Sequence, residues 1–125
     1  MSDADIRQSL NRASEIRLSV KGRKSGRDIP RPVWFVYEDN TLYLLPNYGS
    51  DTNWYKNFQA DPTLKISVSG GGGGRRGEAE EITAKGITIT DSNRVNDIFR
   101  KFDSKYGGVK QYYPKVDVAV EVPIL

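Results

Sequence analysis

Residues 32–45 read PVWFVYEDNTLYLL and carry the strongest signal for regular structure in this chain. Residues 32–37 are rich in β-branched and aromatic side chains, which are typical of a strand, and their proline stands first, where a strand tolerates it. Residues 38–41 are polar and predict a tight turn. Because residues 41–45 are again apolar and β-forming, the whole stretch predicts an antiparallel hairpin.

Further strands are predicted on either side of this hairpin, because apolar residues there alternate with polar or small ones. The alternation covers residues 16–20, 64–68 and, with four valines at every second position, 116–122. Another strand is expected from about residue 78 to 90. Five consecutive glycines at 70–74 precede it, and such a run predicts a flexible hairpin tip, because glycine has no side chain with which to pack.

Three helices complete the prediction. A weakly amphipathic one lies at 3–14, and a short one begins at residue 51 or 52 and is stopped by Asp61-Pro62. The clearest begins at residue 91 or 92, repeats its apolar residues with a helical period, and ends at Gly107. About six short strands without regular strand–helix alternation predict a mainly β, α+β fold, a small antiparallel barrel with peripheral helices. We expect the 125 residues to form a single domain, 1–125.

The composition excludes several kinds of chemistry. The chain contains no histidine and no cysteine, so zinc sites of Cys and His, thiolate nucleophiles and Ser-His-Asp triads are excluded, and we expect no metal site. The acidic amino terminus has no apolar segment of the kind found in signal peptides, and no run approaches the ~20 apolar residues that a membrane helix needs. We therefore expect a cytoplasmic protein without an integral membrane segment, whose chemistry depends on Asp, Glu, Lys, Tyr or a bound cofactor.

Positive charge is concentrated in one short segment. The net charge of the chain is +3, but residues 21–31 contain five basic residues and one acidic residue, so this segment alone carries +4 and the remainder carries −1. Nucleic-acid-binding proteins usually distribute positive charge over a whole face, where it meets many phosphates. A single compact cluster indicates a small polyanion as the ligand.

The turn at residues 22–27, which reads GRKSGR, is the first candidate site. Its two glycines allow a sharp turn that exposes backbone N–H groups, its serine offers a hydroxyl, and its three cations flank them. This combination suits a phosphate group, which needs backbone donors together with charge-assisted hydrogen bonds. A solvated basic hairpin without a ligand is the alternative interpretation.

The second candidate site is the segment 46–57, which reads PNYGSDTNWYKN. Its polar, glycine-containing loop leads into a helix amino terminus, which can bind an anion, and aromatic side chains beside polar donors suit a planar heteroaromatic ligand. The same aromatic residues could instead attach the helix to the barrel. We expect both: one face of the helix packs against the barrel, and the other lines a cleft.

Tyrosines near the carboxyl end form the third candidate site. Tyr106, Tyr112 and Tyr113 lie close to the pair Gly107-Gly108. A phenol can donate a proton or orient a carbonyl, and few other groups in this chain can do so. Packing with a solvated hydroxyl is the alternative for each of them.

These segments together resemble the deazaflavin-dependent nitroreductase family. The matching motifs are GRKSG at 22–26, PVWFV at 32–36, NWYKNF at 53–58 and ADP at 60–62. They occur in the family's order, between Lys21 and Val68. The second half of the chain is similar to the family only in layout, with a strand, a late helix and a terminal valine-rich strand.

The resemblance implies a split β-barrel related to the flavin-binding pyridoxamine-phosphate-oxidase fold, often dimeric. It also implies a bound 8-hydroxy-5-deazaflavin coenzyme, F-420, or FMN in relatives. Arg23, Lys24, Ser25 and Gly26 would hold the coenzyme's phosphate and acidic tail, while Asn53, Trp54 and Asn57 would border its ring. We also expect Arg31, Pro32, Asn47 and Ser50 to contribute to the coenzyme site. The catalytic tyrosine of the family lies in the late tyrosine-rich stretch, so the candidates are Tyr106, Tyr112 and Tyr113.

The expected function is therefore that of an oxidoreductase that transfers a hydride to a conjugated small molecule, such as a nitro compound, a quinone or an enone. The coenzyme carries the hydride, and the protein supplies binding, orientation and exclusion of water. The alternatives are an FMN-binding protein, a deazaflavin carrier without catalysis and a barrel that binds single-stranded nucleic acid. The last is disfavoured because the charge is confined to one turn, so we expect no nucleic-acid partner. A homodimer is expected, because the resemblance implies one.

Overall fold

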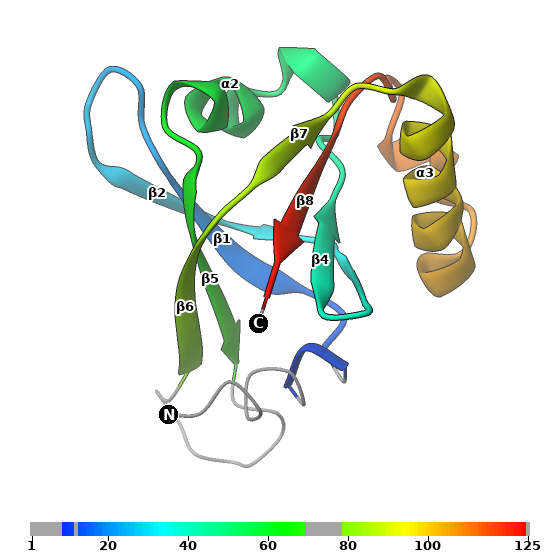
Figure 1. Cartoon of the computed structure of the whole chain (residues 1–125), viewed down its shortest axis with the longest axis horizontal. Coiled ribbons are helices and arrows are strands. Elements are labelled where there is room, and N and C mark those ends of the chain that lie inside the picture. The colour runs from blue at the N-terminus through cyan, green and yellow to red at the C-terminus, as the bar shows by residue number, and fades with distance from the viewer. Residues whose placement is uncertain (1–8, 12, 70–78, 125) are drawn as a thin grey trace.

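The computed structural model describes residues 9–11, 13–69 and 79–124, and this part of the chain contains two four-stranded antiparallel sheets (Figure 1). The strand order is β2-β1-β5-β6 in the first sheet and β3-β4-β8-β7 in the second. The strands are β1 (Ile16–Lys21), β2 (Asp28–Val33), β3 (Val36–Glu38), β4 (Thr41–Leu44), β5 (Thr63–Ser69), β6 (Ala79–Lys85), β7 (Ile87–Ile89) and β8 (Ala119–Pro123). The fold is a split β-barrel, and the predicted mainly β, α+β class is confirmed.

The predicted hairpin is present, but its first strand is broken. The turn is formed by Asp39 and Asn40, both with positive φ, and β3 and β4 pair on either side of it. However, β2 ends at Val33 and β3 begins at Val36, because the chain passes from the first sheet to the second at Trp34 and Phe35. The prediction of one continuous strand over 32–37 was therefore wrong.

A second break divides the strand that was predicted from about 78 to 90. Strand β6 pairs with β5 in the first sheet, and β7 pairs with β8 in the second, so the chain changes sheets at Gly86. A Cβ atom on Gly86 would lie 2.7 Å from Cε1 of Phe58 and 2.9 Å from Cγ1 of Val120, both in the barrel interior. The chain can change sheets there only because residue 86 has no side chain. These two breaks explain why eight strands are found among the described residues where about six were expected.

Helices cover one end and one outer face of the barrel. Helix α2 (Asn53–Ala60) follows the 3-10 turn η1 (Gly49–Asp51) and closes one end of the barrel (Figure 1). Helix α3 (Ser92–Tyr106) lies against the outer face of the second sheet, and the short 3-10 segment η2 (Val109–Tyr112) follows it. As predicted, Asp91 caps α3 by accepting a hydrogen bond from the backbone of Arg94, and Gly107 ends it with φ +77°.

Two apolar clusters account for the packing. The first fills the barrel between the sheets and includes Trp54, Tyr55 and Phe58 from α2. The second lies between the second sheet and α3 and includes Ile98 and Phe102. Of the helix predicted at 3–14, residues 9–11 are described and are helical, and the remainder lies mostly outside the described residues, as does the glycine run 70–74. Among the described helices, none has the length and apolar character needed to cross a bilayer.

Candidate functional site

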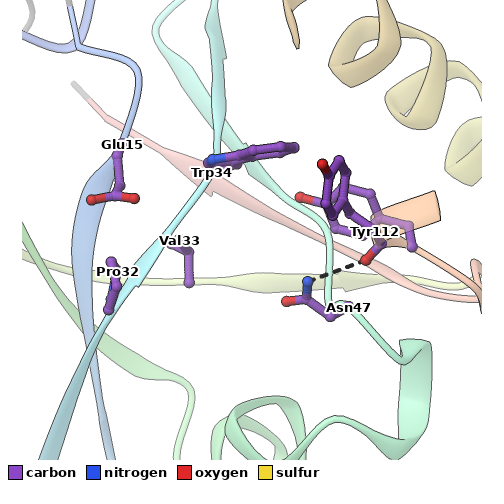
Figure 2. Close-up of a pocket in the computed structure, with 7 residues that line it drawn as sticks. Glu15, Pro32, Val33, Trp34, Asn47 and Tyr112 are labelled. Carbon is purple, nitrogen blue, oxygen red and sulfur yellow. Dashed lines mark hydrogen bonds between the residues drawn. The ribbon is translucent and has the colours of Figure 1, made fainter. Parts of the chain in front are cut away.

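Strand β2 is an edge strand, and two cavities lie beside it. The first, which we call the basic cavity, has a volume of about 320 Å³ and is lined by Gly22, Arg23, Lys24, Ser25, Ile29, Arg31, Asn53 and Asn57. The second, the aromatic cavity, has a volume of about 150 Å³ and is lined by Glu15, Pro32, Val33, Trp34, Asn47, Tyr112 and Tyr113 (Figure 2). Arg31 lines one cavity, and Val33, two residues further along the same side of the strand, lines the other, so the two cavities are neighbours along β2.

The basic turn between β1 and β2 is held in a defined conformation. Its backbone closes through hydrogen bonds from Gly22 N–H to the Arg27 carbonyl and from Gly26 N–H to the Gly22 carbonyl, both 2.8 Å long. Gly26 has φ +71°, which favours glycine. The Ser25 hydroxyl oxygen accepts a hydrogen bond of 3.2 Å from the backbone of Arg27. The predicted glycine-containing turn is therefore present. Its N–H groups at residues 22, 23, 26 and 27 are bonded within the protein and not exposed as predicted, because the turn is closed on itself and on Asn57.

Helix α2 fixes this turn through Asn57. The Asn57 side chain is buried, and its Oδ1 atom accepts hydrogen bonds from the backbone N–H of Arg23 (3.2 Å) and from the guanidinium Nη1 of Arg23 (2.7 Å). Asn53 and Asn57 line the basic cavity, whereas Trp54, Tyr55 and Phe58 are buried in the barrel. The expectation that one face of this helix packs and the other lines a cleft is confirmed.

Arg31 lines the basic cavity and carries an unsatisfied donor. Arg31 is half-buried on β2, between the exposed residues Pro30 and Pro32. Its Nε atom is buried without a hydrogen-bond partner among the described residues. A buried, charged donor without a partner is costly, and an anionic oxygen is the group that would satisfy it. The basic cavity thus combines the chemistry of a phosphate or carboxylate site with room for more than a single ion, so its residues fit the phosphate and acidic tail of a deazaflavin coenzyme.

Trp34 is the largest side chain in the aromatic cavity. Its indole stacks on Tyr106 with ring centroids 4.5 Å apart and an interplanar angle of 10°. Tyr112 meets Trp34 edge-on at 5.3 Å and 72°. Asn47 donates a hydrogen bond of 3.2 Å from Nδ2 to the Tyr112 carbonyl, which joins the loop before η1 to η2 (Figure 2). One face of Trp34 is covered by Tyr106, and another part of its surface lines the aromatic cavity, where a flat ring could stack.

The three candidate tyrosines have different surroundings. The Tyr106 hydroxyl accepts a hydrogen bond from Phe35 N–H (3.0 Å) and lies 2.8 Å from the carbonyl oxygens of Phe35 and Ser14, to one of which it can donate. Burial raises the pKa of Tyr106, and burial likewise raises the pKa of Tyr113. Tyr112 is 51% exposed and lines the aromatic cavity. Tyr112 and Tyr113 therefore reach this cavity, whereas the Tyr106 hydroxyl binds backbone at the break between β2 and β3.

Lys105 supports the same break. Its ammonium group donates a hydrogen bond of 2.8 Å to the Phe35 carbonyl and lies 3.7 Å from the centre of the Phe35 ring. Partial burial of this group lowers the pKa of Lys105 to about 8. The carboxyl end of α3 thus holds Trp34 in position, because Lys105 contacts Phe35, the residue that follows Trp34.

Other predicted site residues lie outside both cavities. Trp54 is 2% exposed and packs in the barrel, so it does not border a ligand there, contrary to the expectation. Ser50 donates hydrogen bonds from its backbone and its hydroxyl to Asp117, at 2.9 and 2.7 Å. Gly26 shapes the turn without lining the basic cavity. The remaining predicted coenzyme residues line one cavity or the other.

Sequence reasoning missed Glu15, Val33 and Trp34 in the aromatic cavity and Ile29 in the basic one. Ile29 follows from the alternation of β2, because it lies on the same side of that strand as Arg31. Glu15 stands before β1, whose Ile16 pairs with Val33, and this register brings it beside Trp34. No motif marks Glu15, so only the pairing of β1 with β2 could have identified it.

The two sheets and the cavities beside β2 belong to a split β-barrel. Residues 1–125 match the family model for F-420H(2)-dependent quinone reductase, and the chain belongs to this family. It is thereby an oxidoreductase of the deazaflavin-dependent kind. No curated protein matches the sequence.

Solved structures confirm the fold. An F-420 reductase is 18% identical, with a TM-score of 0.71, and the match covers 94% of this chain and 90% of that one. The heme storage protein HutZ from Vibrio cholerae is 12% identical with a TM-score of 0.74, covering 98% and 89%. A third structure, described as a domain-swapped dimer, is 16% identical with a TM-score of 0.63, covering 96% and 94%. At these identities the likeness concerns the fold alone.

Proposed function

We propose that the protein binds F-420 along β2 and uses the reduced coenzyme to reduce a small planar acceptor. A quinone is the first candidate for this acceptor, and a nitro compound or an enone is the second. The observation that carries this proposal is a cavity lined by three cations, Arg23, Lys24 and Arg31, beside an aromatic cavity. The Nε atom of Arg31 is buried without a partner among the described residues. The anionic end of one ligand fits the basic cavity, and its flat end would then lie beside the aromatic cavity, which stays open to an acceptor. Family membership supports F-420 as that ligand.

The basic cavity would hold the anionic part of the coenzyme. Arg23, Lys24 and Arg31 supply charge, while Ser25 and Asn53 supply neutral hydrogen-bonding groups. Asn57 keeps Arg23 and the turn in place before the ligand arrives, so less conformational freedom is lost on binding. This arrangement also suits FMN, which has a single phosphate and a flat ring, and FMN is the alternative ligand.

The aromatic cavity would hold the acceptor beside the coenzyme ring. Its volume of about 150 Å³ is smaller than that of a typical site for a whole drug-sized ligand, so it suits a small ring system. Trp34 offers a stacking surface, and Pro32 and Asn47 also line this cavity. When bound, the reduced coenzyme supplies a hydride, and it is oxidised as the acceptor is reduced.

Reduction of a quinone to a hydroquinone needs one proton in addition to the hydride. We assign this proton to Tyr112, because its ring lines the aromatic cavity and it is exposed. Tyr113 is the second candidate, although it is buried and its pKa is raised. Tyr106 would act by holding Trp34, because its hydroxyl is already bonded to backbone groups.

Coenzyme binding tests this proposal. Each charge-assisted contact contributes about 1.5–3 kcal/mol, so Lys24→Ala should weaken the binding of F-420 by about ten- to a hundredfold. Lys85→Ala is the matched control, because Lys85 is exposed on β6, at the opposite edge of the same sheet. Equal affinities of wild type and Lys24→Ala would remove the site assignment. Binding of FMN but not F-420 would replace the coenzyme, and binding of neither would overturn the proposed function.

A further inference from the structure

Glu15 gives the aromatic cavity a charge opposite to that of its neighbour. It is the only charged residue among the seven that line this cavity, whereas the basic cavity is lined by Arg23, Lys24 and Arg31. Within the described part of the chain, the Glu15 carboxylate makes no ion pair. Its charge is therefore free to act on a ligand.

The aromatic rings of the cavity act in the same direction as this carboxylate. The π-faces of tryptophan and tyrosine carry partial negative charge and attract cations, and Trp34 is the most effective ring type for this contact. Figure 2 shows the Glu15 carboxylate at one side of the cavity and Tyr112 at the other, with Trp34 between them. A flat ligand stacked on Trp34 would thus meet electron-rich rings and a negative charge at its edge.

We propose that Glu15 selects the charge of the molecule that occupies the aromatic cavity, so that planar aromatic cations bind there in preference to neutral rings and, above all, to anions. This inference names the acceptor class and rests on the proposed function. The long-range field of a chain with net charge +3 favours anions, so a preference for cations must have a local source. Glu15 is the local source that the cavity contains.

Binding of charge-matched probes tests the proposal without turnover. The probes are 1-methylquinolinium, quinoline and 2-naphthoate, which have two fused rings and are cationic, neutral and anionic near pH 8. Their dissociation constants are measured by calorimetry on protein saturated with oxidised F-420, which cannot reduce them, and on protein without coenzyme. We expect the order cation, neutral, anion from tightest to weakest. Because the carboxylate is exposed, the ratio of cation to anion affinity should fall about three- to tenfold in Glu15→Gln at low ionic strength.

Two further variants sharpen the test. Glu15→Lys should reverse the order and favour 2-naphthoate. Glu81→Gln, an exposed carboxylate on β6 at the far edge of the first sheet, should keep the wild-type ratio. The proposal is overturned if wild type binds the three probes equally, if none of them binds, or if Glu15→Gln retains the wild-type ratio.

Kinetics distinguish failure of this inference from failure of the proposed function. Naphthoquinones that carry a trimethylammonium, a hydroxymethyl or a sulfonate substituent are compared as acceptors with reduced F-420. We expect kcat/KM to follow the same order as the probe affinities. Turnover of all three quinones at similar kcat/KM would contradict charge selection and leave the proposed function standing. Absence of any turnover, with the expected order of probe affinities, would contradict the proposed function and leave the charge selection standing.

Discussion

We predict that Arg31 has opposite effects on ligand binding and on stability. Its buried Nε lacks a partner among the described residues, so the folded protein without ligand contains an unsatisfied charged donor. An isolated buried donor destabilises a protein, whereas the same donor strengthens the binding of an anion. Functional sites commonly show this conflict between stability and activity.

Replacing this residue separates the two effects. Arg31→Met retains an unbranched side chain and removes both the charge and the unsatisfied donor. We predict that its affinity for F-420 falls by about tenfold or more, while its Tm without coenzyme equals or exceeds that of wild type. Thermal unfolding with and without coenzyme measures both quantities. A variant with lower Tm and unchanged affinity would show that Arg31 is a structural residue only.

The tyrosines provide a second comparison at the residue scale. Tyr106→Phe leaves the Phe35 N–H without its partner, so it should lower the free energy of unfolding by about 1–3 kcal/mol. Tyr112→Phe removes an exposed hydroxyl and should leave stability within about 0.5 kcal/mol of wild type, while turnover falls by about 10²–10⁴ if this phenol donates the proton. Urea unfolding and steady-state kinetics on both variants check this. Wild-type turnover in Tyr112→Phe would assign the proton to Tyr113 or to solvent.

The sequence identified many of the residues that line the basic cavity, because the segment GRKSG combines turn residues and cations. It placed Trp54 beside a ligand, and the structure buries this side chain instead. Periodicity alone marks which residues share a helix face but leaves open which face meets the barrel. Glu15 could not be found, since its position depends on the pairing of two strands.

At the scale of elements, hydrophobic patterns predicted where strands and helices lie but not where the chain changes sheets. The two breaks, at Trp34-Phe35 and at Gly86, occur inside stretches with uninterrupted strand-forming character. Each break depends on contacts with a distant segment: the Tyr106 hydroxyl and the Lys105 ammonium bind Phe35, and Phe58 and Val120 pack against Gly86. Local propensity contains no information about such partners.

The break at Gly86 leads to a prediction about this element. Gly86→Ala places a methyl group within 3 Å of Phe58 and Val120, so a packed interior must shift. We expect a loss of about 1–3 kcal/mol in the free energy of unfolding. Lys85→Ala, the exposed neighbouring position, should change it by less than about 0.5 kcal/mol. Equal stabilities of the two variants would show that the corner between the sheets is loosely packed.

At the scale of the whole molecule, we propose a homodimer. In this chain Ile87 is 51% exposed on β7, an edge strand of the second sheet. Exposed apolar residues on an edge strand favour association.

Sedimentation velocity at micromolar concentration tests this proposal. We expect a species of twice 14.0 kDa, and Ile87→Lys should shift the equilibrium toward the monomer. The control for added charge is Thr88→Lys, because Thr88 is the next residue of β7 and is exposed. A lysine at Ile82 would not serve as a control, because Ile82 packs against the barrel interior. A monomer of 14.0 kDa throughout the concentration range would contradict the proposal.

Oxidation of reduced F-420 by a quinone in a single turnover tests the central claim most directly. Protein saturated with the reduced coenzyme is mixed anaerobically with a two-ring quinone, and the visible absorption of the oxidised coenzyme is followed while the hydroquinone is quantified. The account predicts rapid oxidation that saturates with quinone and one hydroquinone formed for each coenzyme oxidised. Tight binding of the reduced coenzyme without oxidation by quinone, nitro or enone acceptors would contradict it and identify the protein as a carrier.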